Sequence, residues 1–263
     1  MGTCVVLPAY NEARALPGLL PRLSELPVLA PHLFSGLCLL VVDDGSDDGT
    51  AEVAAGYPCV RLVRHEHNRG IGAAILSGIV AAVQDPWVSL VVTLDADDTA
   101  GPEVVAALVS ATLQGADLVI ASRYRPGATV LGVPLLRRVM SRLASSLCRL
   151  TFRLPGITDY TSGFRAYSRT CLAAALESWG SELITSRGAA CQLELLWKCT
   201  QGPQGRCFKV TEVPLQLDYG RKPGRTKLKL VSGAWEALGW ALRPLMVRHR
   251  PGGGGYLERG AER

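Results

Sequence analysis

The feature that most constrains this fold is an alternation of short apolar runs with longer stretches of helical periodicity over residues 3–121. Continuous apolar runs are typical of strands buried on both faces, and strands separated by helices indicate βαβ units. We therefore expect an α/β fold with a mostly parallel sheet flanked by helices. The predicted strands are 3–7, 37–42, 60–63, 88–94 and 118–121, and the predicted helices cover about 12–25, 50–56, 71–83 and 102–114.

Polar clusters follow three of these predicted strands. They are Pro8-Ala9-Tyr10-Asn11-Glu12, Asp43-Asp44-Gly45-Ser46 and Asp95-Ala96-Asp97. Each cluster alone is compatible with a solvated turn. Ligands of open α/β sheets bind at the carboxyl ends of the strands, so three acidic clusters at one edge predict a binding site there.

Asp95 and Asp97 are the most specific chemical signal in the chain. Two carboxylates two residues apart at the end of a buried strand repel each other unless a cation lies between them. Mg²⁺ and Mn²⁺ prefer carboxylate oxygens and keep coordination positions for water and substrate phosphates. The clusters after the neighbouring strands favour this metal interpretation over an isolated acidic turn.

Charge is divided unevenly along the chain. Through residue 120 there are 5 Lys and Arg against 14 Asp and Glu, and from residue 121 onward there are 23 against 9. This division predicts two parts with different partners, and the basic part suits nucleic acid, an anionic membrane surface or a phosphate-bearing substrate. A nucleic-acid partner is not expected, because the arginines are not interleaved with aromatic residues in a stacking pattern.

Cysteine usage and hydropathy favour a cytosolic protein. The eight cysteines contain no C-x-x-C pair, which indicates reduced thiols rather than a zinc site. We expect no signal peptide, and no apolar run reaches the roughly 18 residues of a membrane-spanning helix. Membrane attachment would then be peripheral, on the cytoplasmic face, or through an anchoring partner.

Residues 134–154 have leucines at helical spacing and arginines along another face. Those arginines are Arg138, Arg142, Arg149 and Arg153. One interpretation is a helix whose leucines face the core. The other is an amphipathic helix at a membrane interface, with its arginines on lipid phosphates. A C-terminal helix is predicted over 231–250, and 251–263 are expected to be disordered.

Seven short motifs follow one another along the chain, and their order and spacing resemble those of a known family. They are Leu7-Pro8-Ala9-Tyr10-Asn11-Glu12, Val42-Asp43-Asp44-Gly45-Ser46-Asp47-Asp48-Gly49-Thr50, Asn68-Arg69-Gly70, Leu94-Asp95-Ala96-Asp97, Ser122-Arg123-Tyr124, Asp159-Tyr160-Thr161-Ser162-Gly163-Phe164-Arg165 and Arg221-Lys222-Pro223-Gly224-Arg225-Thr226-Lys227. Together they resemble the family-two glycosyltransferases of the GT-A fold. Within that family, the chain is most similar to the dolichyl- or polyprenyl-phosphate mannosyltransferases. The resemblance implies a GT-A domain over residues 1–230.

The resemblance also implies roles for individual residues. Pro8, Tyr10, Glu12 and Asp44 would hold the nucleotide, and Asp95, Ala96 and Asp97 would form the metal corner, with Mg²⁺ or Mn²⁺ on Asp95 and Asp97. Arg123, Arg165, Arg221 and Lys227 would contact donor or acceptor phosphates, with Asp97, Arg123, Arg221 and Lys227 at the catalytic centre. Arg165 is also compatible with a packing role. The family usually has Gln where this chain has Thr99, preceded by an additional acid, Asp98.

The expected reaction is an inverting transfer of a hexose, with mannose from GDP-mannose first among the donors, onto dolichyl or polyprenyl phosphate. An anionic phosphate acceptor needs positive charge to position it rather than a general base. The alternatives are a glucosyltransferase that uses UDP-glucose, and an inactive homologue that binds the membrane surface.

Overall fold

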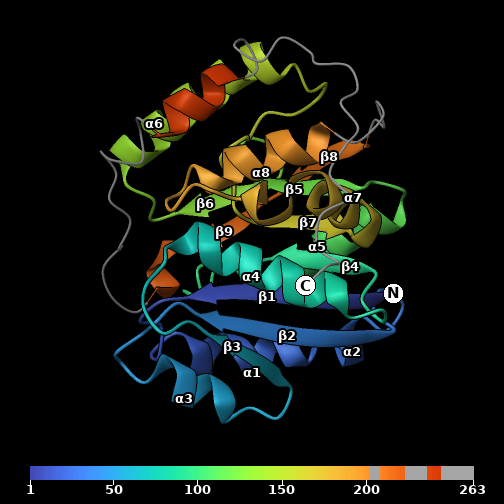
Figure 1. Cartoon of the computed structure of the whole chain (residues 1–263), viewed down its shortest axis with the longest axis vertical. Helices are drawn as coiled ribbons and strands as arrows, with labels where there is room; N and C mark the ends of the chain where they lie inside the picture. Colours follow the sequence, from blue (N-terminus) through green and yellow to red (C-terminus); the bar gives the residue numbers. More distant parts are fainter. Residues whose placement is uncertain (202–207, 223–235, 244–263) are drawn as a thin grey trace, which may run out of the picture.

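The computed structural model describes residues 1–201, 208–222 and 236–243. Its centre is a seven-stranded sheet in the order β3-β2-β1-β4-β7-β5-β8 (Figure 1). The strands are β1 (Gly2–Ala9), β2 (Gly36–Asp43), β3 (Val60–Arg64), β4 (Leu90–Thr93), β5 (Leu118–Ser122), β7 (Arg165–Ser168) and β8 (Val210–Pro214). Only β7 runs antiparallel to its neighbours, β4 and β5. The predicted α/β class and mostly parallel sheet are confirmed.

Successive side chains of a strand point to opposite faces of the sheet, and the continuous apolar strands therefore place apolar side chains on both faces. Helices cover each of these faces. In β1, Val5 and Leu7 belong to one apolar cluster, while Cys4 and Val6 belong to the other. The first cluster packs against α1 (Leu16–Ser24), α2 (Leu26–Leu29), α3 (Thr50–Ala55) and α5 (Pro102–Leu113). The second packs against α4 (Ile71–Gln84), α7 (Arg169–Trp179) and α8 (Cys191–Thr200).

A second, two-stranded sheet pairs β6 (Thr129–Leu131) with β9 (Gln216–Asp218). A short 3-10 turn, η1 (Gly180–Leu183), follows α7, and another, η3 (Tyr219–Arg221), directly follows β9. The sequence does not reveal β6, β7 or β9, because each has only three or four residues and lacks a continuous apolar run.

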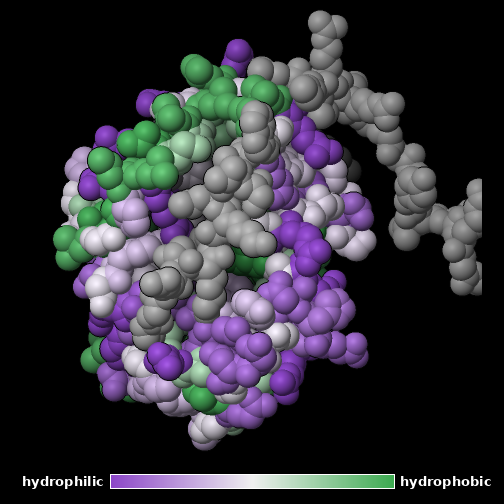
Figure 2. Space-filling model, turned by 90° about the vertical axis from the view of Figure 1, so that its left-hand side faces the viewer, coloured by the Kyte–Doolittle hydropathy of each residue, from purple (hydrophilic) through white to green (hydrophobic). Residues whose placement is uncertain are grey.

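Helix α6 (Leu135–Phe152) confirms the predicted helix over 134–154, but of its leucines only Leu147 packs against the core. Its buried residues are Ser145, Cys148 and Thr151, whereas Leu135, Leu143 and Leu150 are 74%, 62% and 72% exposed. The helix lies at the top of the molecule in Figure 1, and Figure 2 shows the apolar band there. The inward face of α6 is therefore built around Cys148 and Leu147, while most of its leucines are exposed.

The C-terminal predictions fall largely outside the described residues. Of the helix expected over 231–250, residues 236–243 are described and are helical. The tail 251–263, which we expect to be disordered, lies outside the described part. Within the described ranges, no helix is both long and apolar enough to cross a membrane.

Candidate active site

The three acidic clusters converge at one edge of the sheet, as predicted. Ala9 and Asp43 are register partners at the ends of β1 and β2, and β4 ends beside β1, where Val6 pairs with Thr93. The loops that follow these strands therefore start side by side. This parallel register brings segments that are far apart in sequence to one site.

The loop after β1 is fixed to the loop after β2. The Asn11 amide donates to Ser46 Oγ at 2.9 Å, and the Glu12 amide donates to Thr50 Oγ1 at 2.8 Å. Pro8 is half-buried, while Tyr10 is exposed at the edge. The structure therefore brings Pro8, Tyr10 and Glu12 to the predicted edge, and their nucleotide-binding role stays a prediction.

Asp44 is turned into the protein instead of toward an open surface. Its carboxylate accepts the Arg69 and Gly70 amides at 3.0 and 2.8 Å, and His65 Nδ1 lies 2.6 Å from Oδ1. The residue is only 2% exposed. Because both oxygens have protein partners, Asp44 holds the turn after β3, and its role in holding the nucleotide stays a prediction.

Asp95 and Asp97 form a carboxylate pair that suits a cation. Burial first, and then the charge of Asp97, raise the pKa of Asp95 to about 7, while the positive charges of Arg137 and Lys222 lower it. Two partly desolvated carboxylates this close together favour a divalent cation between them, so the pair fits the implied metal ion. Ala96, between them, is buried.

The pair offers few ligands of its own. Within residues 1–201, 208–222 and 236–243, no group of three or more His, Cys, Asp or Glu side chains is arranged to hold a metal ion. A metal ion held by Asp95 and Asp97 would depend on water and on a bound ligand for its other positions.

Lys222 is the cation in direct contact with this pair. Its Nζ donates to Asp97 Oδ2 at 2.6 Å, and the two side chains are only 11% and 12% exposed. The residue that the family resemblance places here is the neighbouring Arg221, which is exposed. Lys227, also predicted at the site, lies outside the described residues. The signal for Lys222 is in the same motif, but the sequence does not indicate which of its basic residues turns inward.

Arg123 is committed to an internal ion pair. Its Nε and Nη2 donate to the two oxygens of Asp159 at 2.7 and 2.6 Å, and Nη2 also donates to Thr161 Oγ1 at 2.7 Å. The Arg123 guanidinium lowers the pKa of the buried Asp159 carboxylate. This geometry leaves Nη1 as the part of Arg123 that could contact a phosphate.

Arg165 lies in the core, which corrects its predicted place at the phosphates. It is 0% exposed, and its guanidinium donates to the carbonyls of Gln192 and Tyr160 at 2.6 and 2.7 Å. These backbone acceptors pair Nη1 and Nη2 of the buried side chain where it emerges from β7, while its buried Nε has no hydrogen-bond partner among the described residues. The packing interpretation of Arg165 is the one that the structure supports.

Arg137 in α6 is a site residue that sequence analysis misses. Its guanidinium lies 5.4 Å from the centre of the Tyr219 ring, and its positive charge lowers the pKa of Asp95. One turn later, Ser141 Oγ lies 2.6 Å from Thr161 Oγ1, the hydroxyl that Arg123 contacts. The predicted basic face begins at Arg138 and so leaves out Arg137, whose charge acts on Asp95.

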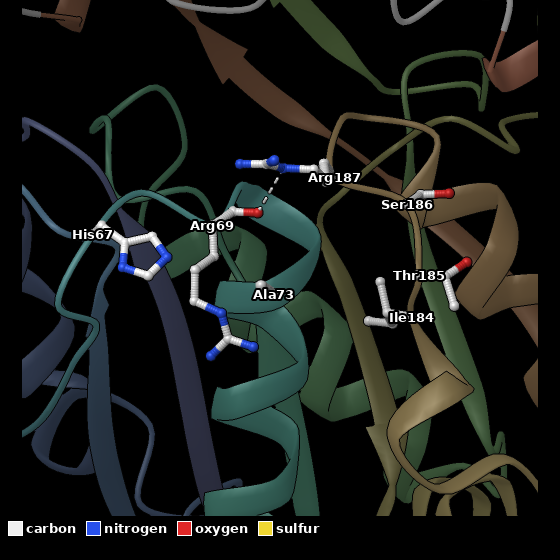
Figure 3. Close-up of a pocket in the computed structure, with 7 residues that line it drawn as sticks. All are labelled: His67, Arg69, Ala73, Ile184, Thr185, Ser186 and Arg187. Atoms are coloured by element: carbon white, nitrogen blue, oxygen red, sulfur yellow. Dashed lines mark hydrogen bonds between the residues drawn. The ribbon is translucent and has the colours of Figure 1, made fainter.

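A separate cavity of about 330 Å³ lies between α4 and the segment 184–187. Its lining residues are His67, Arg69, Ala73, Ile184, Thr185, Ser186 and Arg187 (Figure 3). Arg187 Nε donates to the Arg69 carbonyl at 3.2 Å, which ties the two walls together. None of the carboxylates or arginines predicted to bind donor or acceptor lines this cavity.

Comparison with known proteins agrees with this geometry. Residues 4–174 match the family model described as glycosyl transferase family 2. A polyprenol monophosphomannose synthase of Mycolicibacterium smegmatis is 33% identical over 256 residues, which cover 94% of this chain and 90% of the relative. An undecaprenyl-phosphate mannosyltransferase of Micrococcus luteus is 30% identical over 87% of this chain and 88% of its own length.

The fold also has a match among solved structures. A glucosyl-3-phosphoglycerate synthase of Mycobacterium tuberculosis, solved with Mn²⁺, uridine diphosphate and phosphoglyceric acid, superimposes with a TM-score of 0.67. That match covers 94% of this chain and 80% of the solved chain at 23% identity, which supports the GT-A fold. The sheet order, the Asp95–Asp97 pair and the sequence match together establish that this chain belongs to glycosyl transferase family 2.

Proposed function

We propose that the protein is an inverting glycosyltransferase that moves mannose from GDP-mannose onto dolichyl or polyprenyl phosphate. One observation carries the proposal: the Asp95–Asp97 pair lies within the electrostatic reach of Arg137, on a helix whose apolar face points outward. A nucleotide-sugar site and a lipid-facing surface thus adjoin. The names of the two curated relatives, both enzymes of mannose and a polyprenyl phosphate, support the same substrates.

On the donor side, Asp95 and Asp97 would hold Mg²⁺ or Mn²⁺ on the diphosphate. When bound, the metal ion would offset the negative charge that develops on the leaving nucleoside diphosphate. The exposed Tyr10 and the half-buried Pro8 and Glu12 lie at the same edge of the sheet and would contact the nucleotide.

On the acceptor side, the lipid phosphate would attack the anomeric carbon directly, because it is already anionic at neutral pH. No general base is required, and the protein's task is to hold two anionic substrates in line. Arg137 and Lys222 supply positive charge beside Asp95 and Asp97, and we assign Arg221, Lys227 and Nη1 of Arg123 to the same task.

The acceptor reaches this site from a membrane surface in our proposal. Leu135, Leu136 and Leu143 are exposed on α6, and an interfacial helix would bury them at the lipid headgroups. The polyprenyl phosphate would then approach Arg137 from the same surface. We propose peripheral attachment at the cytoplasmic face, either through α6 alone or with an anchoring partner.

A transfer assay tests the proposal. Purified protein is incubated with Mg²⁺ or Mn²⁺, polyprenyl phosphate in detergent, and either radiolabelled GDP-mannose or UDP-glucose. We expect a labelled lipid from GDP-mannose and none from the Asp97→Ala variant. Transfer from UDP-glucose alone would support the glucosyltransferase alternative, and failure with both donors would support an inactive membrane-binding homologue.

A further inference from the structure

We propose that Thr99 is a positioning residue for Asp97: it fixes one carboxylate oxygen, Oδ1, and so would leave the other, Oδ2, to hold the metal ion. The inference rests on the proposed metal-dependent transfer and assigns a purpose to the position where this chain departs from its family. Thr99 would act through Asp97 and would not itself be a metal ligand.

Thr99 makes two hydrogen bonds to a single oxygen of Asp97. Its hydroxyl donates to Asp97 Oδ1 at 2.6 Å, and its backbone amide donates to the same oxygen at 3.2 Å. Thr99 is 2% exposed and Asp97 is 8% exposed, so water competes little with these bonds. Hydrogen bonds to a buried carboxylate are the stronger kind and fix the rotation of the group.

The backbone between the two residues is shaped for this contact. Asp98 has a φ of 62°, in the left-handed region that Asp adopts more readily than most residues. The turn brings the amide and hydroxyl of Thr99 back onto Asp97. The Asp98 side chain pairs with Arg22 of α1, so the additional acid anchors the turn.

Thr99 also connects Asp97 to the segment that carries Lys222. The Thr99 carbonyl accepts the Asp218 amide at 2.9 Å, at the end of β9. The Asp218 carboxylate then accepts the Gly220 amide at 2.8 Å, and the chain continues to Lys222, whose Nζ contacts Asp97 Oδ2 at 2.6 Å. Asp97 is thus held on both oxygens, by Thr99 on Oδ1 and by the Lys222 ammonium on Oδ2.

This arrangement explains how the site works with Thr in place of Gln. The Thr99 hydroxyl is used on Asp97 Oδ1, so the side chain at this position orients a ligand instead of supplying one. Oδ2 makes no bond to Thr99 and is paired with the Lys222 ammonium, so a metal ion at Oδ2 would take the place of that ammonium. Partners that orient metal ligands typically change metal affinity about 10–100-fold when removed.

The test measures Mn²⁺ binding to the full-length protein by electron paramagnetic resonance, with and without GDP. Thr99→Val removes the hydroxyl at nearly constant volume, and we expect its Mn²⁺ affinity to fall about 10–100-fold. Thr99→Ser keeps the hydroxyl, and we expect it to restore most of that affinity. Thr112→Val is the matched control, because Thr112 is also buried but bonds to the Leu108 carbonyl within α5.

Unchanged Mn²⁺ affinity in Thr99→Val, or an equal loss in Thr112→Val, would overturn the inference. If Thr99→Val does not fold, Thr99→Ala provides the same comparison with Thr99→Ser. In active protein, the half-saturating metal concentration should rise with kcat at saturating metal largely retained. If the wild type transfers no sugar but Thr99→Val still lowers the Mn²⁺ affinity, the proposed function fails and the inference about Thr99 stands.

Discussion

At the scale of single residues, the Asp95 carboxylate is destabilising until a cation neutralises it. Burial and Asp97 raise its pKa to about 7, above that of an unfolded Asp. Between about pH 4 and that value, the folded protein therefore retains a proton that the unfolded chain has lost. Stability contributed by the protonated group is present below this range and is lost as the pH rises through it.

Asp95→Asn should therefore stabilise the metal-free protein, and more so at higher pH. Thermal unfolding in a chelator at about pH 5 and about pH 8 would show a Tm gain for the variant that grows with pH. Added Mn²⁺ should raise the Tm of the wild type but not of the variant. A Tm difference that does not depend on pH would contradict the assignment of the repulsion to Asp95.

Which site residues could be predicted from the sequence depends on how local their signal is. Asp95 and Asp97 follow a buried strand, and strand ends in a parallel sheet meet at one edge, so their position is predictable. Lys222 and Arg137 reach the pair only through tertiary packing, and neither has a local pattern that distinguishes it from nearby basic residues. Arg165 looks the same in sequence whether it meets a phosphate or two buried carbonyls.

At the scale of elements, the leucine spacing of α6 predicts that this segment is a helix, but it does not predict which face of the helix packs inward. The inward face carries small residues, Ser145 and Cys148, together with Arg137 at the site. An outward apolar stripe on a surface helix is unusual for a monomer and indicates an interaction surface.

Replacing Leu135 and Leu143 by Ser should weaken binding to lipid vesicles. Burying a leucine contributes about 1.5–3 kcal/mol, so the double variant should lose at least about tenfold in partitioning. Sedimentation with anionic vesicles measures the effect. The matched control replaces Val28 and Leu29, which are 82% and 68% exposed at the end of α2, and should leave partitioning unchanged. Equal losses in both double variants would contradict a specific role for α6.

At the scale of the whole molecule, the uneven charge of the sequence marks two parts that meet at one site. The acidic part supplies Asp95 and Asp97, and the basic part supplies Arg137 and Lys222. The sequence predicts this division but not the meeting point, because the contact between Asp97 and Lys222 spans 125 positions. The parallel core was predictable from its strands, whereas the antiparallel β7 between β4 and β5 was not.

Trp240, which follows the basic motif that begins at Arg221, packs against Trp197 of α8 and the segment that contains Ser186. It is 6% exposed, its indole Nε1 donates to Ser186 Oγ at 2.8 Å, and its ring centre lies 6.1 Å from that of Trp197. Lys198 Nζ lies 5.2 Å from the same ring. The chain therefore has a fixed point at Lys222, on Asp97, and a second at Trp240, on α8.

Trp240→Ala should reduce stability and also weaken use of the lipid acceptor. Loss of a buried Trp costs about 3–5 kcal/mol, which a lower Tm would report. If the basic residues Arg221 and Lys222 depend on the fixed point at Trp240, the KM for polyprenyl phosphate should rise more than the KM for the donor.

The matched control is Trp87→Ala, because Trp87 lies beside Gly2 and Gly36 at the opposite, amino end of β1 and β2. Both variants remove a tryptophan, but only Trp240 is connected to the segment that follows Lys222. If Trp240→Ala does not fold, Trp240→Phe keeps the apolar packing and removes the bond to Ser186. A fall in Tm with an unchanged ratio of the two KM values would show that Trp240 only stabilises α8. A selective rise in the acceptor KM would show that a contact far from Asp97 supports Lys222, which contacts it.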